Sequence, residues 1–510
     1  MSLKIAFRVD ASRLIGTGHV IRCLSLANAL STEGVSCLFI CREHKGHLID
    51  LIRREGHEVL LLSAPSVYLS PDWKEWLGAD WQSDAEQTLQ ALKRIHLDWL
   101  VVDHYALDAR WEGRLRQNCE RLMVIDDLAD RLHDCDLLLD QNLVANLHER
   151  YVGLLPERGA TLLGPTYALL QPVYEDMHKK ARPRVGKPRR LFVFFGGVDD
   201  DKLTHTTLAA LLTLDLSEIH VDVVVPDSNP HRDEIKTLLC GAHHICLHGT
   251  QPSLAPLLLD ADLAIGAGGA TSWERLCLGL PALVVTLAPN QRPIADELDK
   301  RGLVHWVGEK DSLRVDELAA KIHTILQQPL DEWSANCLKV VDGLGVRRVC
   351  AALLADKNTP LIARPISQFD EVQVLEWAND PLTRRNSFSS ALITPESHHL
   401  WFARQLNNPQ CHFYLIEIAG SLPAGQVRFQ HEQDGWNVHF TMNPVLRGRG
   451  LGTALLKIGL KAFAQEQSGA LVVGKVKPAN HASCRMFESL GFNFVSAAGA
   501  DVAIYQSKLF

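Results

Sequence analysis

Short apolar runs alternate with segments of helical length through most of the chain, and this alternation limits the possible folds more than any other feature. From the N-terminus, the runs are KIAFRV, SCLFIC, DWLVVDHY, RLMVIDD and DLLLDQN. Runs of this length, separated by helix-length segments, predict parallel strands in a doubly wound α/β sheet. The pattern restarts with LFVFFGG, HVDVVVPD, HHICLHG, DLAIGAGG and PALVVTLAPN. The sequence therefore predicts two α/β units, with ligands gathered at the carboxyl ends of both sheets.

Two proline-containing segments divide the 510 residues. KKARPRVGKPRR, residues 179–190, is basic, lacks apolar periodicity and is typical of a linker. A second boundary lies near DKNTPLIARP, residues 356–365, and the following runs CHFYLIEIAG, SLPAGQVRFQ and GWNVHFTMNP indicate an antiparallel meander. We therefore expect three domains, formed by residues 1–180, 190–350 and 362–510.

Composition argues against several kinds of partner and site. The formal net charge is −8 and no basic stripe is present, so nucleic acid is not an expected partner. Charges at Lys4, Arg8 and Asp10 exclude a signal peptide, and no apolar run approaches about 18 residues, so we expect a cytoplasmic protein without a membrane segment. The twelve cysteines are scattered, without a Cys-x-x-Cys pair or a Cys/His ligand cluster, which predicts reduced thiols and no metal.

A glycine-rich turn joins the first predicted strand to a helix in RLIGTGHVIRCLSLANAL, residues 13–30. Free backbone N–H groups at a helix N-terminus form an anion site, which Gly18 and Arg22 would border. His19 is suited to act as a general base because an imidazole titrates near neutral pH. Asp10, at the end of the first strand, either orients His19 or contacts a substrate; alternatively, Arg22 pairs with Asp10 as scaffolding.

The second α/β unit carries a candidate site for a nucleoside diphosphate. Paired glycines end two of its predicted strands: Gly196, Gly197, Gly268 and Gly269. Glycine lets the backbone approach a diphosphate, Ser272 is placed to cap the next helix, and Glu274 can accept hydrogen bonds from ribose hydroxyls. In the alternative interpretation, the glycines only turn the chain and Glu274 is a solvated helix residue.

These motifs carry two family resemblances. The second unit resembles the nucleotide-binding half of GT-B sugar-nucleotide enzymes, which include the N-acetylglucosaminyltransferase of peptidoglycan synthesis. This resemblance implies a GT-B-like pair of Rossmann-type domains, in which Glu274 binds the ribose of UDP while Asn290 and Gln291 face the sugar. FRVDASRLIGTGHVIRCLSLA, VVDHYALD and VIDDLADRLHDCDLLLDQN are similar to UDP-sugar hydrolases of pseudaminic acid biosynthesis, over roughly residues 1–345.

Those hydrolases cleave UDP-2,4-diacetamido-2,4,6-trideoxy-β-L-altropyranose to the free sugar and UDP. The resemblance implies that His19 is the catalytic residue and that Tyr105, in VVDHY, helps to hold the attacking water. From composition alone, Tyr105 would be a packing residue at the rim. No metal is required by this chemistry.

The third domain contains a second glycine-rich turn before a helix, in NPVLRGRGLGTALLKIGLKAFAQ. This segment fits R-x-x-G-x-G, and with VKPANHASCRMFESLGF it resembles the GCN5-related N-acetyltransferases over residues 362–510. That resemblance implies an α+β fold with acetyl-CoA as cosubstrate. The residues implied to bind acetyl-CoA are Arg447, Gly448, Arg449, Gly450, Leu451, Gly452 and Asn480.

One position departs from that family. Phe487 stands where many relatives have a tyrosine that protonates the departing thiolate, so Ser483, Cys484 or solvent would have to serve. His439, in the preceding strand, is either a base for the amine or an ordinary strand residue; water is the other candidate base.

The fused resemblances imply two consecutive steps on UDP-linked diamino sugars. The third domain would acetylate the 4-amino group of UDP-4-amino-4,6-dideoxy-N-acetyl-β-L-altrosamine, and the first two would hydrolyse the product. Three alternatives remain: a GT-B glycosyltransferase, an acetyltransferase for another amino sugar or a protein N-terminus, and a non-catalytic sugar-nucleotide sensor.

Overall fold

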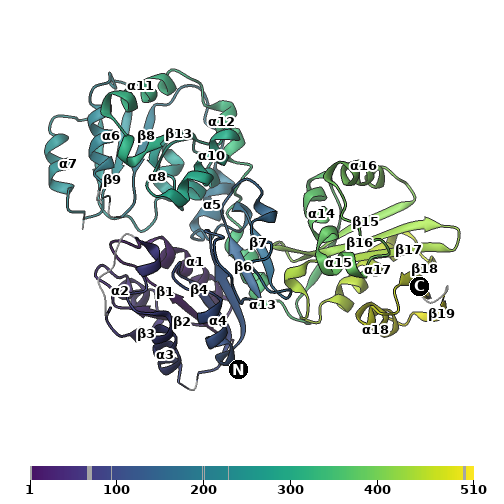
Figure 1. The fold of residues 1–510 in the computed structure, drawn as a ribbon. Helices are drawn as coiled ribbons and strands as arrows, with labels where there is room; N and C mark the ends of the chain where they lie inside the picture. Colours follow the sequence, from purple (N-terminus) through teal and green to yellow (C-terminus); the bar gives the residue numbers. More distant parts are fainter. Residues whose placement is uncertain are drawn as a thin grey trace. The chain divides into compact units, whose positions relative to one another are not determined.

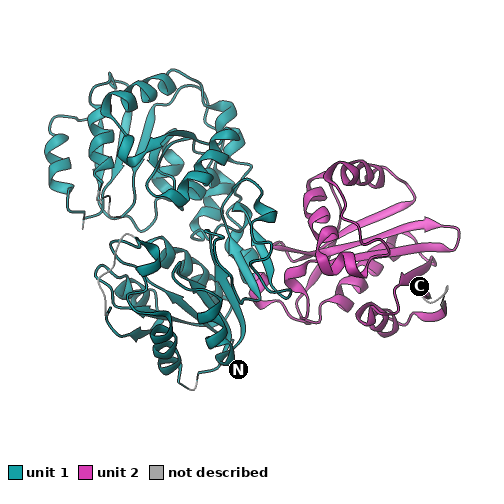
Figure 2. Cartoon of the chain, in the orientation of Figure 1, with its two compact units in different colours: residues 1–350 teal, residues 351–510 magenta. Residues whose placement is uncertain are grey.

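The structure is a computed structural model that describes residues 3–65, 72–93, 95–197, 199, 201–227, 229–497 and 501–509. The chain divides into two compact units, residues 1–350 and 351–510 (Figure 2). Helix α13 (Gly345–Leu354) contains the boundary between them.

The first unit contains two parallel sheets, each covered by helices (Figure 1). The strand order of the first sheet is β3-β2-β1-β4-β5-β6-β7. Its strands are β1 (Lys4–Val9), β2 (Ser36–Arg42), β3 (Glu58–Leu62), β4 (Leu97–Asp103), β5 (Cys119–Ile125), β6 (Leu137–Asp140) and β7 (Ala160–Leu163). The helices of this part are α1 (Gly18–Thr32), α2 (Ile49–Arg54), α3 (Trp81–Leu92) and α4 (Ala109–Leu115), and α5 (Val173–Lys180) follows in the chain but packs against helices of the second sheet.

The second sheet has the order β10-β9-β8-β11-β12-β13. Its strands are β8 (Arg190–Phe194), β9 (His220–Val224), β10 (Ile245–His248), β11 (Leu263–Ala267), β12 (Ala282–Thr286) and β13 (His305–Glu309). Its helices are α6 (Leu203–Leu211), α7 (Arg232–Leu238), α8 (Ala255–Asp260), α9 (Thr271–Cys277), α10 (Arg292–Lys300), α11 (Val315–Leu326) and α12 (Asp331–Cys337).

Successive residues of β8 enter two different cores, which explains the unbroken apolar run LFVF. Leu191 and Val193 pack in one core, whereas Phe192 packs in the other. A strand buried on both faces has no polar face to show in its sequence. Both sheets follow the Rossmann order 3-2-1-4-5-6, so the predicted GT-B-like pair of Rossmann-type folds is confirmed.

The second unit is an α+β fold, also as expected. Its sheet has the order β14-β15-β16-β17-β18-β20-β19. The strands are β14 (Leu361–Pro365), β15 (Cys411–Ile418), β16 (Leu422–Glu432), β17 (Gly435–Met442), β18 (Leu471–Val476), β19 (Asn493–Ala497) and β20 (Ala503–Lys508). The helices are α14 (Glu371–Asn379), α15 (Pro381–Asn386), α16 (Pro395–Leu406), α17 (Gly452–Glu466) and α18 (His481–Ser489).

Strands β15 to β17 form the predicted antiparallel meander, and β14 pairs antiparallel with β15, whereas β17 and β18 pair in parallel. The parallel register joins Trp436 to Val472 and ends where Val438 meets Gly474. Residues 439–442 therefore continue β17 without β18 beside them, and the two strands part. In the described part of the chain, no helix has the length and apolar character needed to cross a bilayer.

Candidate active sites

His19 lies in the first turn of α1, directly after the glycine turn. Gly16 has φ of 81°, in the left-handed region that favours glycine, and the helix begins at Gly18. The first N–H groups of a helix have no partner within it, so this turn offers donors to an anion beside His19.

Asp103, the last residue of β4, holds His19 in place. Its Oδ1 atom lies 2.6 Å from His19 Nδ1 and also accepts from Arg22 Nη2 at 2.6 Å, while its Oδ2 accepts from Arg22 Nε at 2.7 Å. Burial of Asp103 opposes its ionisation, but Arg22 and His19 outweigh that effect and keep its pKa below the ordinary value. A carboxylate on Nδ1 favours the tautomer that leaves Nε2 free to accept a proton.

Asp10 makes neither of the two protein contacts that were predicted for it. Its Oδ2 pairs with Arg8 Nη1 at 2.8 Å, and its Oδ1 accepts the backbone N–H of Arg42 at 2.7 Å. Arg8 precedes Asp10 by two residues, so both side chains lie on the same face of the strand and neutralise each other. The prediction that Asp10 orients His19 or pairs with Arg22 is therefore wrong, because Asp103 takes both contacts.

Tyr105 lies beside His19 and also contacts the second sheet. The two ring centroids are 4.8 Å apart with the planes at 84°, and Trp76 stacks on Tyr105 at 5.8 Å. Burial, with the nearby Asp127 carboxylate, raises the pKa of Tyr105, so its hydroxyl remains protonated at neutral pH. Asn290 Nδ2 donates to this hydroxyl at 3.4 Å. The structure thus brings His19, Tyr105 and Asn290 together.

The glycines at the ends of β8 and β11 lie close to other predicted site residues. A Cβ on Gly197 would lie 3.7 Å from the Thr17 side chain, so the turn after β8 faces the turn before α1. A Cβ on Gly268 or on Gly269 would lie 3.7 Å or 3.6 Å from the Gln291 amide. Gly196, with φ of 104°, turns the chain at the end of β8.

Glu274 lies in the first turn of α9 and keeps one carboxylate oxygen unused. Its Oε2 atom is buried and has no hydrogen-bond partner among the described residues. Burial raises the pKa of Glu274 to about 7, and the neighbouring Tyr174 hydroxyl and Arg275 offset this only in part. A buried acceptor without a donor fits a hydroxyl-bearing ligand. Ser272 does not cap the helix as predicted, because its hydroxyl accepts from Arg275 Nη2 at 2.9 Å.

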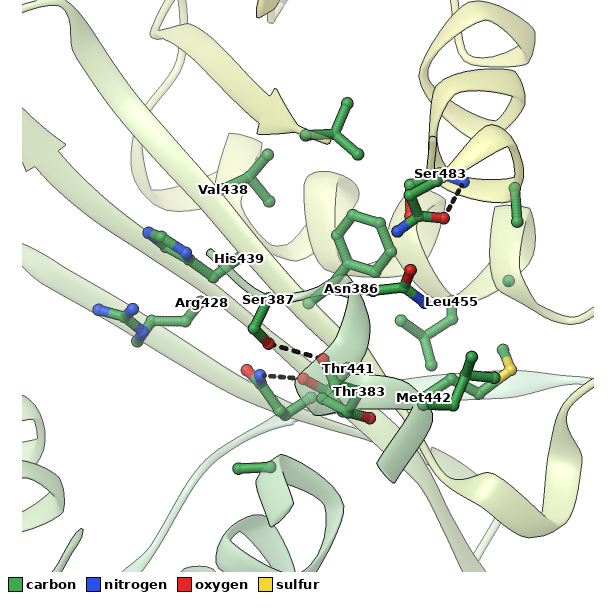
Figure 3. Close-up of a pocket in the computed structure, with 18 of the residues that line it drawn as sticks. Thr383, Asn386, Ser387, Arg428, Val438, His439, Thr441, Met442, Leu455 and Ser483 are labelled. Carbon is green, nitrogen blue, oxygen red and sulfur yellow. Dashed lines mark hydrogen bonds between the residues drawn. The ribbon is translucent and has the colours of Figure 1, made fainter. Parts of the chain in front are cut away.

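The second unit contains a cavity of about 920 Å³ at the point where β17 and β18 part (Figure 3). Gly448 and Gly450, with φ of 72° and 78°, turn the backbone along its wall, and α17 begins at Gly452. A Cβ at Gly452 would lie 2.9 Å from Met486 Sδ, so the glycine also allows α17 to approach α18 closely. Asn480 caps α18 through Ser483 N at 3.2 Å.

The two loop arginines are engaged within the protein. Arg447 Nη1 pairs with Asp380 at 2.6 Å and its Nη2 donates to Thr383 Oγ1 at 2.8 Å. Arg449 is buried and donates to the carbonyl oxygen of Ala355 at 3.5 Å. Leu451, which directly precedes α17, is also buried, and it lines the cavity. Arg447 and Arg449 were predicted to bind acetyl-CoA. In the structure, their guanidinium groups instead bind neighbouring residues and stabilise the loop.

Arg428 and His439 are paired across β16 and β17 and line the other part of the cavity. Arg428 lies 5.3 Å from the Trp401 ring centroid, and its Nη1 donates to the amide oxygens of Gln405 and Gln430 at 3.4 Å each. Among the described residues, no carboxylate lies within ion-pair distance of Arg428. Surrounding protein and the Arg428 and Lys475 cations lower the pKa of His439 to about 4, so its imidazole is neutral at pH 7.

The Phe487 ring cannot supply a proton. It is buried and stacks on Tyr505, with the centroids 5.4 Å apart. Ser483 lines the cavity.

A family model described as an acetyltransferase (GNAT) domain matches residues 361–493. The second unit carries a GNAT acetyltransferase domain.

The chain has relatives that cover either all of it or its first part. An uncharacterized protein of Methanocaldococcus jannaschii is 23% identical, over 99% of this chain and 100% of its own length. The UDP-2,4-diacetamido-2,4,6-trideoxy-β-L-altropyranose hydrolase of Campylobacter jejuni is 25% identical, over 59% of this chain and 97% of its own length. Among solved structures, MurG of Acinetobacter baumannii is 14% identical and covers 69% of this chain and 99% of its own, with a TM-score of 0.48. The first part of the chain thus resembles a sugar-nucleotide hydrolase, and a GNAT domain is fused to it.

Sequence reasoning missed Asp103 and Arg428. Asp103 stands two positions before Tyr105 in VVDHY, and its place at the end of a strand was the signal available. Arg428 had no such signal, because its lack of a carboxylate partner depends on side chains from other elements.

Proposed function

We propose that the first unit hydrolyses UDP-2,4-diacetamido-2,4,6-trideoxy-β-L-altropyranose and that the GNAT domain makes this substrate by acetylating a UDP-linked 4-amino sugar. The observation that carries the first part is the His19–Asp103–Arg22 cluster beside Tyr105 and Asn290. The Campylobacter relative named for that hydrolysis supports the choice of substrate.

In the hydrolysis, His19 Nε2 takes a proton from a water molecule that the protonated Tyr105 hydroxyl helps to hold. The water oxygen forms a bond to the anomeric carbon, and the bond from that carbon to the diphosphate oxygen breaks, with its electron pair leaving on UDP. Backbone N–H groups at the start of α1 stabilise the departing charge, because this helix end carries unpaired donors. Glu274 accepts hydrogen bonds from the ribose hydroxyls.

In the acetyl transfer, bound acetyl-CoA supplies the acetyl group. The glycine loop from Gly448 to Gly452 gives its pyrophosphate access to backbone N–H groups at the start of α17. The amine nitrogen forms a bond to the thioester carbonyl carbon while the neutral His439 imidazole takes the proton that the amine loses. The bond from that carbon to sulfur breaks with its electron pair leaving on the CoA thiolate, which Ser483, Cys484 or solvent protonates. Arg428, whose hydrogen bonds go to neutral amide oxygens, recognises an acceptor that carries negative charge, as a UDP-sugar does.

The test uses the full chain and two separate assays, UDP release from the diacetamido substrate and acetyl transfer to the amino sugar. We expect His19→Ala to abolish UDP release and to leave acetyl transfer unchanged. His323→Ala, at an exposed position of α11, is the matched control and should change neither. UDP release that survives in His19→Ala would overturn the assignment, and UDP release that requires an added sugar acceptor would favour a glycosyltransferase.

A further inference from the structure

A cluster of metal-ligating side chains lies far from both active sites in sequence, on the edge of the second sheet. Asp222 of β9 and Cys246 of β10 are direct neighbours in the parallel register, and His248 follows Cys246 by two residues. Residues two apart on a strand point to the same face, so all three side chains share one face of the sheet. Their ligand atoms lie within 4.8 Å of one another.

The contacts inside the cluster resemble those around a metal ion. His248 Nε2 lies 2.7 Å from Asp222 Oδ1, and His220 Nε2, from the same face of β9, lies 3.4 Å from that oxygen. Arg190 Nε donates to the other oxygen, Asp222 Oδ2, at 2.6 Å. A ligating carboxylate is commonly oriented in this way by a donor on its second oxygen, while the first oxygen binds the metal.

The donor set selects among metals. One thiolate, imidazole nitrogens and one carboxylate oxygen are the ligands that Zn²⁺ takes in tetrahedral sites, whereas Mg²⁺ and Ca²⁺ prefer oxygen alone. Cys246 is exposed and His248 is half-buried, so an ion can reach the cluster from solvent.

We propose that Asp222, Cys246 and His248 form a zinc site. Binding releases the Cys246 thiol proton to solvent, and the ion replaces the proton shared between His248 Nε2 and Asp222 Oδ1. Since β10 is an edge strand of its sheet, the ion ties that edge to β9 and has a structural role, separate from hydrolysis and acetyl transfer.

No single segment of the sequence indicates this site, because its ligands come from two strands. Cys-x-His in β10 and His-x-Asp in β9 are each short and unremarkable, and only the parallel register places them together. The proposal departs from our expectation of a protein without a Cys/His ligand cluster.

The test is titration of the tag-free, chelator-treated full chain with Co²⁺, followed by displacement with Zn²⁺. We expect one tightly bound equivalent with a thiolate-to-cobalt charge-transfer band that Zn²⁺ removes. Cys246→Ser should remove the band, and His248→Gln should weaken Zn²⁺ binding at least tenfold. The exposed Cys240→Ser and His323→Gln variants are matched controls and should leave both readouts unchanged.

Circular dichroism on each variant establishes that it is folded before titration. A wild-type chain without the thiolate band would overturn the proposal, as would a band that persists in Cys246→Ser. Unchanged Zn²⁺ affinity in a folded His248→Gln variant would overturn it as well.

Discussion

Replacing Asp103 with asparagine tests the arrangement that positions His19. The carboxylate accepts from His19 at 2.6 Å and from Arg22 at 2.7 and 2.6 Å, with no exposure of the Asp103 side chain. An amide has one acceptor oxygen, so its NH2 group must face either a donor of Arg22 or the Nδ1 edge of His19. We expect kcat for UDP release to fall by about 10²–10⁴-fold, the contribution typical of a positioned general base.

The same substitution also lowers stability. Removing the charge from a buried ion pair costs about 3–5 kcal/mol in the free energy of unfolding. Because the pKa of Asp103 is lowered in the folded state, this stabilisation is present above the ordinary carboxyl pKa and is lost as the pH falls through the folded value. The wild-type and variant proteins should therefore differ most at neutral pH and converge in acid.

Asp84→Asn separates the two effects. Asp84 is also fully buried and accepts from Arg8 at 2.8 Å and Arg42 at 2.6 Å, but it makes no hydrogen bond to His19. It should lose comparable stability in denaturant unfolding while its folded fraction keeps the wild-type kcat. Equal kcat in the folded Asp103→Asn and wild-type proteins would refute the positioning role, as would an equal loss in Asp84→Asn.

Three further substitutions probe the other groups. Glu274→Gln should raise the free energy of unfolding by about 1–3 kcal/mol at pH 8 and by less at pH 5, because a carboxyl whose folded pKa is about 7 destabilises the fold when ionised. The affinity for UDP, measured by calorimetry, should fall. An unchanged affinity would contradict the ribose contact. Gly448→Ala and Gly420→Ala should each cost about 1–2 kcal/mol, since both have left-handed φ (72° and 67°) and open space at Cβ, but only Gly448→Ala should weaken acetyl-CoA binding. Arg428→Met should raise KM for a UDP-linked amine at least tenfold and leave KM for acetyl-CoA unchanged in steady-state assays; an equal effect on the same amino sugar without UDP would argue against charge recognition.

The parts of the account that could be predicted from sequence are those encoded locally. The run LFVF of β8 and the glycine turn before His19 are short segments whose apolar pattern or backbone requirement is visible in a few residues. The same holds for Gly448 and Gly450, which the structure places at left-handed φ.

Contacts between segments that lie far apart in the sequence were harder to predict. Asp10 and Asp103 both lie at the carboxyl ends of parallel strands, so position in the sequence does not distinguish them, and only the packing of α1 decides that Asp103 meets His19. Likewise, Arg428 is distinguished by the absence of a carboxylate among its described neighbours, a property that no single segment contains.

The most direct test of the central claim follows one reaction mixture by NMR and mass spectrometry. The full chain is supplied with UDP-4-amino-4,6-dideoxy-N-acetyl-β-L-altrosamine, with and without acetyl-CoA. The account predicts acetylated free sugar and UDP in the presence of acetyl-CoA and unchanged substrate in its absence. An acetylated UDP-sugar that accumulates without cleavage would contradict the hydrolase assignment, and equal UDP release without acetyl-CoA would contradict the order of the two steps.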